Sequence, residues 1–271
     1  MKRVVFNQKG GVGKTSISCN LAAISAQQGF KTLLIDLDTQ CNSSEYLLGP
    51  RYAEKENTAA DFFKSFLGMF NRKHYLPTFC HPTQFARLSV MPASIELSAL
   101  ERDLESRQKI YKLREALVQL SEHYDRIYID TPPALNFYSR AALIAADSLL
   151  IPFDCDSFSR QALYSLVNTV GEIREDHNPK LVIEGVVISQ YSAQARLPND
   201  LVDQLKNDGL PVLASYLSTS VKMKESREFH LPMVHYAPKH KLTVQYLNLY
   251  RLLEGGRLLP VDDTASQAEN A

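Results

Sequence analysis

The fold of this chain is decided by one segment near its start, Asn7-Gln8-Lys9-Gly10-Gly11-Val12-Gly13-Lys14-Thr15. The segment follows a short apolar run, Arg3–Phe6, and precedes a stretch with helical spacing, Thr15–Gln28. Glycines let such a loop fold tightly, so that several backbone N–H groups converge on phosphate oxygens. The following helix adds its positive N-terminal end. The pattern predicts a P-loop, and the flanking strand and helix make a coincidental Gly-Lys-Thr turn the weaker interpretation.

The P-loop predicts ATP and Mg²⁺ as the cofactors. Lys14 is expected to bridge the β- and γ-phosphates, and the Thr15 hydroxyl is expected to bind Mg²⁺. The residues that the loop pattern predicts to contact ATP are Gly10, Gly11, Val12, Gly13, Lys14, Thr15 and Ser16, whereas Lys9 on the residues alone could equally be a solvated loop lysine.

Apolar runs rich in branched residues alternate with helical patterns along the rest of the chain. Runs that are apolar on both faces fit buried strands, and the intervening helices fit right-handed crossovers. We therefore expect an α/β single-domain P-loop fold, with a mainly parallel twisted sheet of about seven to eight strands and helices on both faces. The expected strands are Arg3–Phe6, Thr32–Ile35, Leu88–Met91, Arg126–Ile129, Ser148–Phe153, Leu181–Ser189 and Pro211–Tyr216, and the expected helices are Thr15–Gln28, Ser94–Ser121, Ser139–Ala146 and Gln161–Arg174.

No long linker divides the chain, so the prediction is one ATPase domain over residues 1–260 and a disordered acidic tail over 261–271. The stretch Gly49–Arg87 is hard to place. Its aromatic residues have the spacing of one helix face, and core packing is the favoured interpretation over partner docking. They are Phe62, Phe63, Phe66 and Phe70.

The composition of the 271 residues is that of a soluble globular protein: 45% are hydrophobic, 22% are charged, and the net charge is zero. No apolar run approaches the ~20 residues that cross a bilayer. The four cysteines are far apart and lack metal-ligand spacing, so we expect free thiols in a reducing cytoplasm.

Two carboxylates, Asp36 and Asp38, are expected at the carboxyl end of a buried strand, the edge where open α/β sheets bind ligands. Because side chains alternate along a strand, these two point the same way. Further on, Asp130 ends another apolar run and is followed by Pro132 and Pro133, which stiffen the next loop. An Asp in that place can hold a magnesium-bound water, although capping a turn is the commoner role of a strand-end Asp.

The loop Lys9-Gly-Gly-Val-Gly-Lys-Thr resembles the deviant Walker A motif of the ParA/MinD family of partitioning and positioning ATPases, and Gln8 resembles the ParA branch. The resemblance implies that Lys9 reaches across an ATP-bound homodimer to the partner's phosphates. It also implies that Asp38 orients or polarises the attacking water and that Asp36 and Asp130 support the Mg²⁺ shell. Lys9, Lys14 and Asp38 would be the catalytic residues, and the switch residues would be Asp38, Gln40, Asp130, Pro132 and Pro133.

The resemblance covers nearly the whole chain but departs from the family pattern in several places. Thr39 and Cys41 stand where the second acidic motif normally has Pro and Gly. The run Tyr191–Leu197 keeps one of the arginines that ParA proteins often carry, Arg196, and Leu217–Lys222 keeps a basic residue only at its end. The departure at Tyr191–Leu197 weakens a transferred DNA site, and the departure at Leu217–Lys222, near the place of the family's adenine pocket, leaves the contacts to the base open.

Between Ser215 and Arg257 the chain has seven basic and three acidic residues, a net charge of +4. A locally basic surface can bind DNA phosphates without reading sequence, and a solvated charged face is the alternative. The candidate DNA-binding residues are Arg196, Lys222, Lys224 and Arg227. We expect a cytoplasmic, nucleoid-associated protein that does not bind membrane, because its last segment is acidic.

The sequence therefore predicts a ParA-type ATPase switch with slow ATP hydrolysis, ATP-dependent non-specific DNA binding, and a ParB-like activator or cargo adaptor as a further partner. Its use would be to segregate or position DNA or another large cargo. One alternative is a metabolic ATP-dependent ligase or synthase of the same fold, and another is a MinD-like ATPase that acts at a membrane. The scattered cysteines argue against a redox ATPase of the nitrogenase iron protein type.

Overall fold

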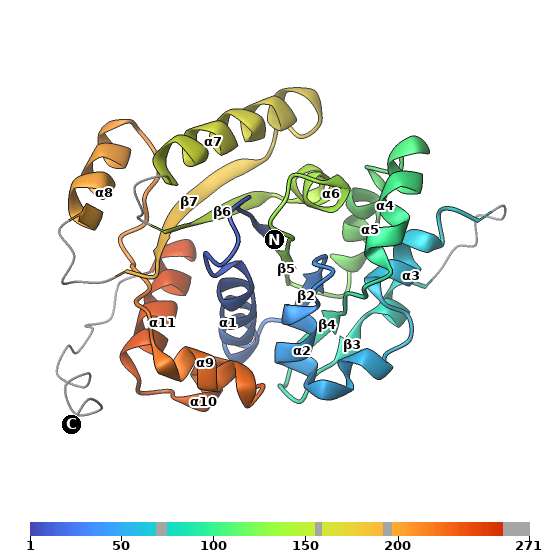
Figure 1. The fold of residues 1–271 in the computed structure, drawn as a ribbon. Coiled ribbons are helices and arrows are strands. Elements are labelled where there is room, and N and C mark those ends of the chain that lie inside the picture. Colours follow the sequence, from blue (N-terminus) through green and yellow to red (C-terminus); the bar gives the residue numbers. More distant parts are fainter. Residues whose placement is uncertain (69–74, 155–158, 192–196, 257–271) are drawn as a thin grey trace.

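The computed structural model describes residues 1–68, 75–154, 159–191 and 197–256. In these residues seven strands form one sheet with the order β3-β4-β2-β5-β1-β6-β7 (Figure 1). Six strands are parallel, and only β3 runs antiparallel to its neighbour β4. The expected sheet is confirmed. The strands are β1 Lys2–Val5, β2 Thr32–Asp36, β3 His81–Pro82, β4 Leu88–Met91, β5 Arg126–Asp130, β6 Ser148–Asp154 and β7 Val182–Ser189.

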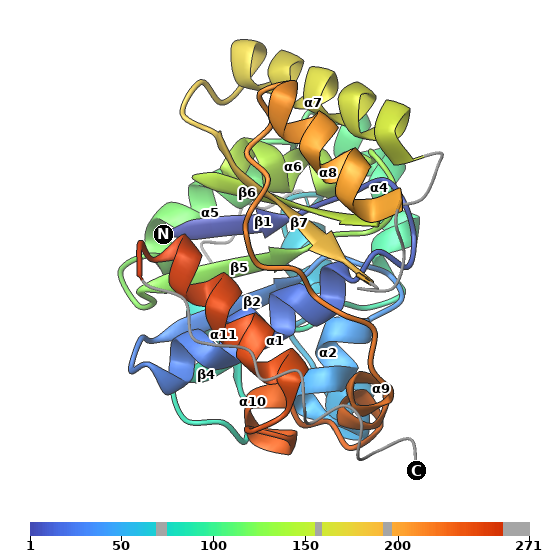
Figure 2. The ribbon, with the colours of Figure 1, turned by 90° about the vertical axis from the view of Figure 1, so that its left-hand side faces the viewer.

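Helices cover both faces of the sheet (Figure 1). One face carries α1, α2, α9, α10 and α11, and the other carries α3 to α8. Figure 2 shows α11 lying beside α1 on the first face. The helices are α1 Lys14–Gln27, α2 Asn42–Leu48, α3 Ala59–Lys64, α4 Leu97–Ser106, α5 Lys112–Leu120, α6 Phe137–Ala145, α7 Ser159–Asp176, α8 Leu197–Asn207, α9 Val221–Glu228, α10 Met233–Tyr236 and α11 Lys241–Leu253, with short 3₁₀ turns at Pro50–Glu54 and Leu76–Phe79.

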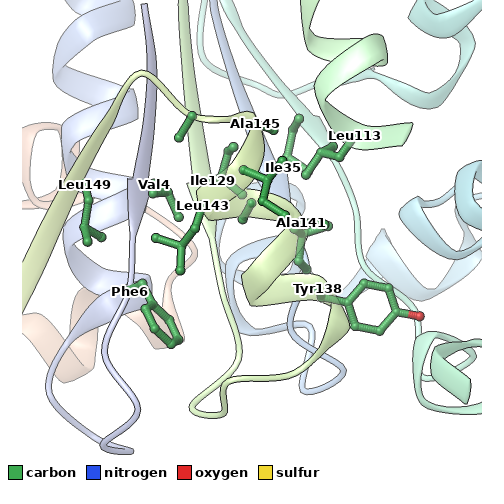
Figure 3. Packing of buried hydrophobic residues seen from close by; sticks show 14 of the residues in the cluster. Val4, Phe6, Ile35, Leu113, Ile129, Tyr138, Ala141, Leu143, Ala145 and Leu149 are labelled. Carbon is green, nitrogen blue, oxygen red and sulfur yellow. The ribbon is translucent and has the colours of Figure 1, made fainter. Parts of the chain in front are cut away.

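The strand side chains alternate between two hydrophobic clusters, one under each helical layer. In β1, Val4 packs into the cluster under α4 to α7, and Val5 packs into the cluster under α1 and α11. Ile35 and Ile129 face the same way as Val4 (Figure 3). The residue after Ile129, Asp130, therefore lies on the face of the sheet that carries α1, because neighbouring strand residues point to opposite faces.

The stretch Gly49–Arg87 is a small subassembly at the β4 edge of the sheet. Phe62 and Phe63 of α3 are buried, and their ring centroids lie 4.9 Å apart in an edge-to-face arrangement. Phe66 packs on Phe62 in the same way, at 5.1 Å. Core packing of these three aromatic residues is thus confirmed, whereas Phe70 lies outside the described residues.

Two predicted elements are wrong. The expected strand Pro211–Tyr216 makes only an isolated bridge to β7, Val186 to Val212, because Pro211 has no N–H to donate and the next backbone hydrogen bond after Leu213 comes only at Leu217, which is too far along to continue a ladder. The expected single helix Ser94–Ser121 is two helices, α4 and α5. Gln108 between them has φ +54°, a left-handed conformation that a right-handed helix does not accommodate.

Among the described residues, no helix combines the length and the apolar character that a membrane span requires. The tail proposed for residues 261–271 lies outside the described residues, as do residues 257–260 at the end of the predicted domain.

Candidate nucleotide-binding site

The phosphate loop connects β1 to α1, which begins at Lys14. Gly11 and Gly13 have φ of +75° and +90°, conformations that a residue with a side chain adopts only with strain. A Cβ built on either glycine has no neighbouring atom within 4 Å. The space around these two glycines is therefore open, and a ligand can approach the backbone there closely.

Two side chains, Asn7 at the start of the loop and Gln190 beyond β7, hold the loop in this shape. Asn7 donates from Nδ2 to the Pro152 carbonyl at 2.7 Å, and its Oδ1 accepts the Lys9 N–H at 2.9 Å. Gln190, just beyond β7, donates from Nε2 to the Gly11 carbonyl at 2.5 Å. The loop is thus fixed to β6 and to the end of β7 before any ligand binds.

The two lysines of the loop point to different places. Lys14 is 7% exposed, and its Nζ donates to the Lys9 carbonyl at 3.0 Å. Burial lowers the pKa of Lys14, whereas Asp130 and Asp38 oppose this shift. Lys9 is partly exposed and forms an ion pair with Asp154 at the end of β6, with Nζ 3.2 Å from Oδ2. One loop thus presents one lysine to its interior and another at its rim.

Asp130 is completely buried at the end of β5, where three hydroxyl groups surround its carboxylate. The hydroxyls of Thr15 and Ser43 donate to Oδ2 at 2.7 and 2.5 Å, and Ser18 lies 3.4 Å from Oδ1. Burial raises the pKa of Asp130, and the hydrogen bonds from Ser43 and Thr15 counter that effect. These hydroxyls stabilise a carboxylate that burial shields from solvent.

Asp36 pairs in register with Asp130 on the neighbouring strand and is also completely buried. Its oxygens accept the N–H of Asp38 at 3.0 Å and both the N–H and the hydroxyl of Ser44, at 2.9 and 2.7 Å. Burial, together with the charge of Asp130, raises the pKa of Asp36 to about 7. In this structure Asp36 therefore anchors the start of α2.

The remaining predicted switch residues lie on the two loops that follow β2 and β5. Asp38 is 7% exposed, and its Oδ1 accepts the Gln40 N–H at 3.0 Å. After β5, Pro132 is buried and Pro133 is exposed. The sheet thus brings Lys14, Thr15, Asp38 and Asp130 to one edge, as the sequence suggested, although their catalytic and metal-binding roles stay predictions.

A cavity of about 550 Å³ opens beside the loop. This volume lies in the range of small-ligand pockets. Its walls come from the loop, the end of β7, the segment before α9, α9 itself and α11. The lining residues include Gly11, Gly13, Ser16, Ser189, Gln190, Leu217, Ser218, Thr219, Ser220, Met223, Lys224, Arg227 and Tyr246.

The residues at this edge of the sheet fit a nucleoside triphosphate and Mg²⁺. The glycine loop offers backbone donors over open space, Lys14 offers a cation, and the adjoining cavity has room for a nucleoside. Magnesium in nucleotide sites keeps phosphate and water ligands and takes only one or two oxygens from the protein. The Thr15 hydroxyl is the candidate for such an oxygen, since its proton is directed at Asp130 and its lone pairs remain available.

Three of the four candidate DNA-binding residues lie on α9, beside the cavity. Lys222 forms an ion pair with Glu225 at 3.0 Å on α9. Lys224 and Arg227 are exposed and line the cavity beside the loop. Arg196 lies outside the described residues.

Sequence reasoning missed the groups that support the site. Ser43 and Ser44 directly follow the second acidic motif, Asp36–Asn42, and this position in the chain is the one signal that they lie near the site. Gln190 and the cavity wall at Leu217–Ser220 carry no local pattern that identifies them.

Known proteins resemble this chain in sequence and in structure. A family model described as an AAA domain matches residues 2–183. The chromosome partitioning protein ParA of Myxococcus xanthus is 32% identical over 251 residues, 92% of this chain and 86% of that protein. The structure of apo McdA from Cyanothece superposes with a TM-score of 0.80 at 21% identity and covers 94% of this chain and 99% of that chain.

The same fold also occurs in a biosynthetic enzyme. Cobyrinic acid a,c-diamide synthase from Mycobacterium smegmatis, solved with ADP and magnesium, superposes with a TM-score of 0.74 at 24% identity, and the match covers 97% of this chain and 98% of that chain. The fold alone therefore does not identify the family, but the match to the Myxococcus protein over nearly the whole chain does. This chain belongs to the ParA family of P-loop ATPases.

Proposed function

We propose that this protein is a ParA-type switch that binds ATP and Mg²⁺, closes into a homodimer and hydrolyses ATP to reopen. The observation that carries the proposal is the divergence of the two loop lysines. Lys14 is buried against its own loop, and Lys9 lies at the rim in an ion pair. A cation at the rim can serve the phosphates of a second subunit, which makes dimerisation depend on the γ-phosphate.

Within one subunit, Lys14 and the backbone N–H groups of the loop would bind the phosphates, and Thr15 would hold Mg²⁺. When bound, Mg²⁺ neutralises charge that develops on the phosphate oxygens. Asp130 holds the Thr15 hydroxyl, and Asp36 supports the same region through the start of α2. Asp38 is the candidate for orienting or polarising the attacking water, because it lies at this edge and is only slightly exposed.

Hydrolysis by the isolated protein is proposed to be slow, with full activity only after an activator binds. An activator can complete a P-loop site by supplying a group in trans. A ParB-like protein or a cargo adaptor is the proposed partner, since the Myxococcus relative is a chromosome partitioning protein. Its binding would end the ATP-bound state.

The proposed target of the ATP-bound dimer is DNA, bound through phosphates and without sequence preference. Lys222, Lys224 and Arg227 of α9, together with Arg196, supply the positive charge, and a dimer doubles that charge. Because Lys224 and Arg227 also line the cavity, nucleotide and DNA would act on the same helix. The protein would then reside on the nucleoid in the cytoplasm.

The dimer is tested by multi-angle light scattering with ATP and Mg²⁺ in an Asp38→Ala background, which is expected to slow hydrolysis. The Asp38→Ala protein should be dimeric with ATP and monomeric with ADP. The added substitution Lys14→Ala should abolish nucleotide binding, whereas Lys9→Ala should leave nucleotide binding but lose the dimer. An ATP-dependent dimer that persists without the Lys9 side chain refutes the contact across the subunits.

The DNA proposal is tested by gel shift at several salt concentrations. Lys222→Glu combined with Arg196→Glu should abolish a shift that requires ATP. A matched control is Lys31→Glu with Arg87→Glu, which reverses the same number of charges at the opposite edge of the sheet. If the control loses DNA as fully as the first pair, the DNA surface is not at α9.

A further inference from the structure

Ser43 is a buried hydroxyl beside the proposed magnesium site that ATP chemistry does not by itself explain. It lies in the first turn of α2, is 0% exposed, and donates to Asp130 Oδ2 at 2.5 Å. Asp130 stands at the end of β5, 87 positions further along the chain. This hydrogen bond therefore links the start of α2, which follows Asp38, to the end of β5. There Asp130 also accepts the hydroxyl proton of Thr15.

Two hydroxyls share one carboxylate oxygen at this point. Thr15 Oγ1 and Ser43 Oγ lie 2.7 and 2.5 Å from Oδ2 of Asp130. A carboxylate oxygen has two lone pairs, so these two donors use the hydrogen-bonding capacity of Oδ2. In this orientation Asp130 cannot coordinate a cation directly through Oδ2. It would influence the cation indirectly, by holding the Thr15 hydroxyl that binds it.

The direction of both hydroxyl protons follows from the same geometry. A hydroxyl has a single proton, and Thr15 donates its proton to Asp130, which leaves both lone pairs of Thr15 Oγ1 available to a cation. Cys19 Sγ lies 3.3 Å from Ser43 Oγ and donates to it. Since Ser43 accepts from Cys19, its own proton is directed at Asp130.

We propose that Ser43 is a positioning residue for Mg²⁺: it fixes the carboxylate of Asp130 against Thr15, so that the Thr15 oxygen is preset to receive the ion. The inference rests on the proposed function, since it assumes that the loop binds Mg²⁺ with a nucleotide. Partners of a metal ligand typically alter metal affinity about 10–100-fold when they are removed. Without Ser43, Asp130 can turn, and Thr15 loses its fixed acceptor.

A role in packing alone makes a different prediction. Loss of a buried hydroxyl that only packs destabilises the fold, and it changes the affinity for nucleotide equally in the presence and absence of Mg²⁺. A role in holding Thr15 affects only the part of nucleotide affinity that depends on Mg²⁺. The two roles are therefore separated by measuring nucleotide binding in the presence and absence of the metal.

The experiment titrates a fluorescent ADP analogue into the full chain, once with Mg²⁺ and once with EDTA. For Ser43→Ala, the Mg²⁺-dependent gain in affinity should fall by roughly tenfold or more, while the affinity in EDTA stays within about twofold of wild type. Ser25→Ala is the matched control, because Ser25 is equally buried, lies on α1, and contacts the Thr32 hydroxyl rather than Asp130. It should leave both affinities unchanged.

Two further variants keep the test decisive. Ser43→Cys keeps the size of the side chain with a weaker donor, so it should give a smaller loss even if Ser43→Ala folds poorly. In a Thr15→Ala background, Ser43→Ala should have no additional effect on the Mg²⁺ dependence. An undiminished Mg²⁺ gain in Ser43→Ala overturns the role of Ser43 alone, whereas wild-type protein that binds no nucleotide overturns the proposed function and this role with it.

Discussion

Lys9 and Asp154 form an ion pair within one subunit, with Lys9 Nζ 3.2 Å from Asp154 Oδ2, and the pair joins the rim of the phosphate loop to the end of β6. The same lysine is the residue proposed to reach the phosphates of a second subunit. It must therefore leave Asp154 when the dimer closes, and the energy of the ion pair opposes closure.

Asp154→Asn should strengthen the ATP-dependent dimer. Both partners are partly exposed, so each pair contributes at most about 1 kcal/mol, and the dissociation constant of the dimer should fall several-fold. The constant is measured by sedimentation with ATP in the Asp38→Ala background. Asp147→Asn, which removes a carboxylate at the opposite end of β6, is the control, and a weaker dimer in Asp154→Asn contradicts the prediction.

The buried pair Asp36 and Asp130 predicts an unusual pH dependence for the ligand-free protein. Burial and the charge of Asp130 raise the pKa of Asp36 to about 7, against about 3.9 in an unfolded chain. Between about pH 4 and pH 7 the Asp36 carboxyl is protonated in the folded chain and ionised in the unfolded chain. The contribution of Asp36 to the free energy of unfolding is therefore fully present below about pH 4 and is lost as the pH rises through 7.

We therefore expect the melting temperature in EDTA to fall between pH 5 and pH 8, by an amount that corresponds to roughly 2 kcal/mol. Asp36→Asn should flatten this slope. Burial lowers the pKa of His235, which acts in the opposite direction, whereas burial raises the pKa of Asp130 as well, so the comparison with the variant isolates the buried carboxyl pair from His235. A wild-type slope that Asp36→Asn leaves unchanged would assign the pH dependence to other groups.

Local patterns predicted much of this molecule. The loop from Asn7 to Thr15 and the strand ends at Asp36 and Asp130 are continuous segments, and parallel strands bring their carboxyl ends to one edge by topology alone. Side-chain periodicity also placed Phe62 and Phe63 in the core, where the structure has them. These features needed no knowledge of distant contacts.

The supporting contacts could not be predicted in the same way. Gln190 reaches Gly11 only because β7 ends beside the loop, and Ser43 reaches Asp130 only because the first turn of α2 lies beside the end of β5. The break in the predicted helix Ser94–Ser121 has no proline or glycine to mark it. Each of these features depends on tertiary packing, which overrides local preference.

Gly185 in β7 should tolerate no side chain. A Cβ at this position would lie 2.4 Å from Leu213 Cγ and 2.6 Å from its Cδ1, so Leu213 and the segment behind it would have to move. Gly185→Ala should therefore destabilise the protein by about 1–3 kcal/mol, the usual cost of overpacking.

Chemical denaturation measures the loss, and the matched control is Gly171→Ala. Gly171 lies within α7, and a Cβ there meets no atom within 4 Å. The control should gain about 0.5–1 kcal/mol, because alanine favours a helix more than glycine does. If both substitutions changed stability by the same amount, Leu213 would not be the cause.

The cavity beside the loop predicts that a substitution in its wall can weaken binding of the nucleoside without weakening binding of the phosphates. Thr219 is exposed and lines the cavity, so Thr219→Trp would fill space that a nucleoside needs without touching Lys14 or the loop. ATP should bind at least about tenfold more weakly, a change of about 1.4 kcal/mol. Tripolyphosphate should bind as it does to wild type, and Thr219→Ser should bind both ligands normally. Calorimetric titration measures all these affinities, and an equal loss for ATP and tripolyphosphate would mean that the nucleoside lies elsewhere.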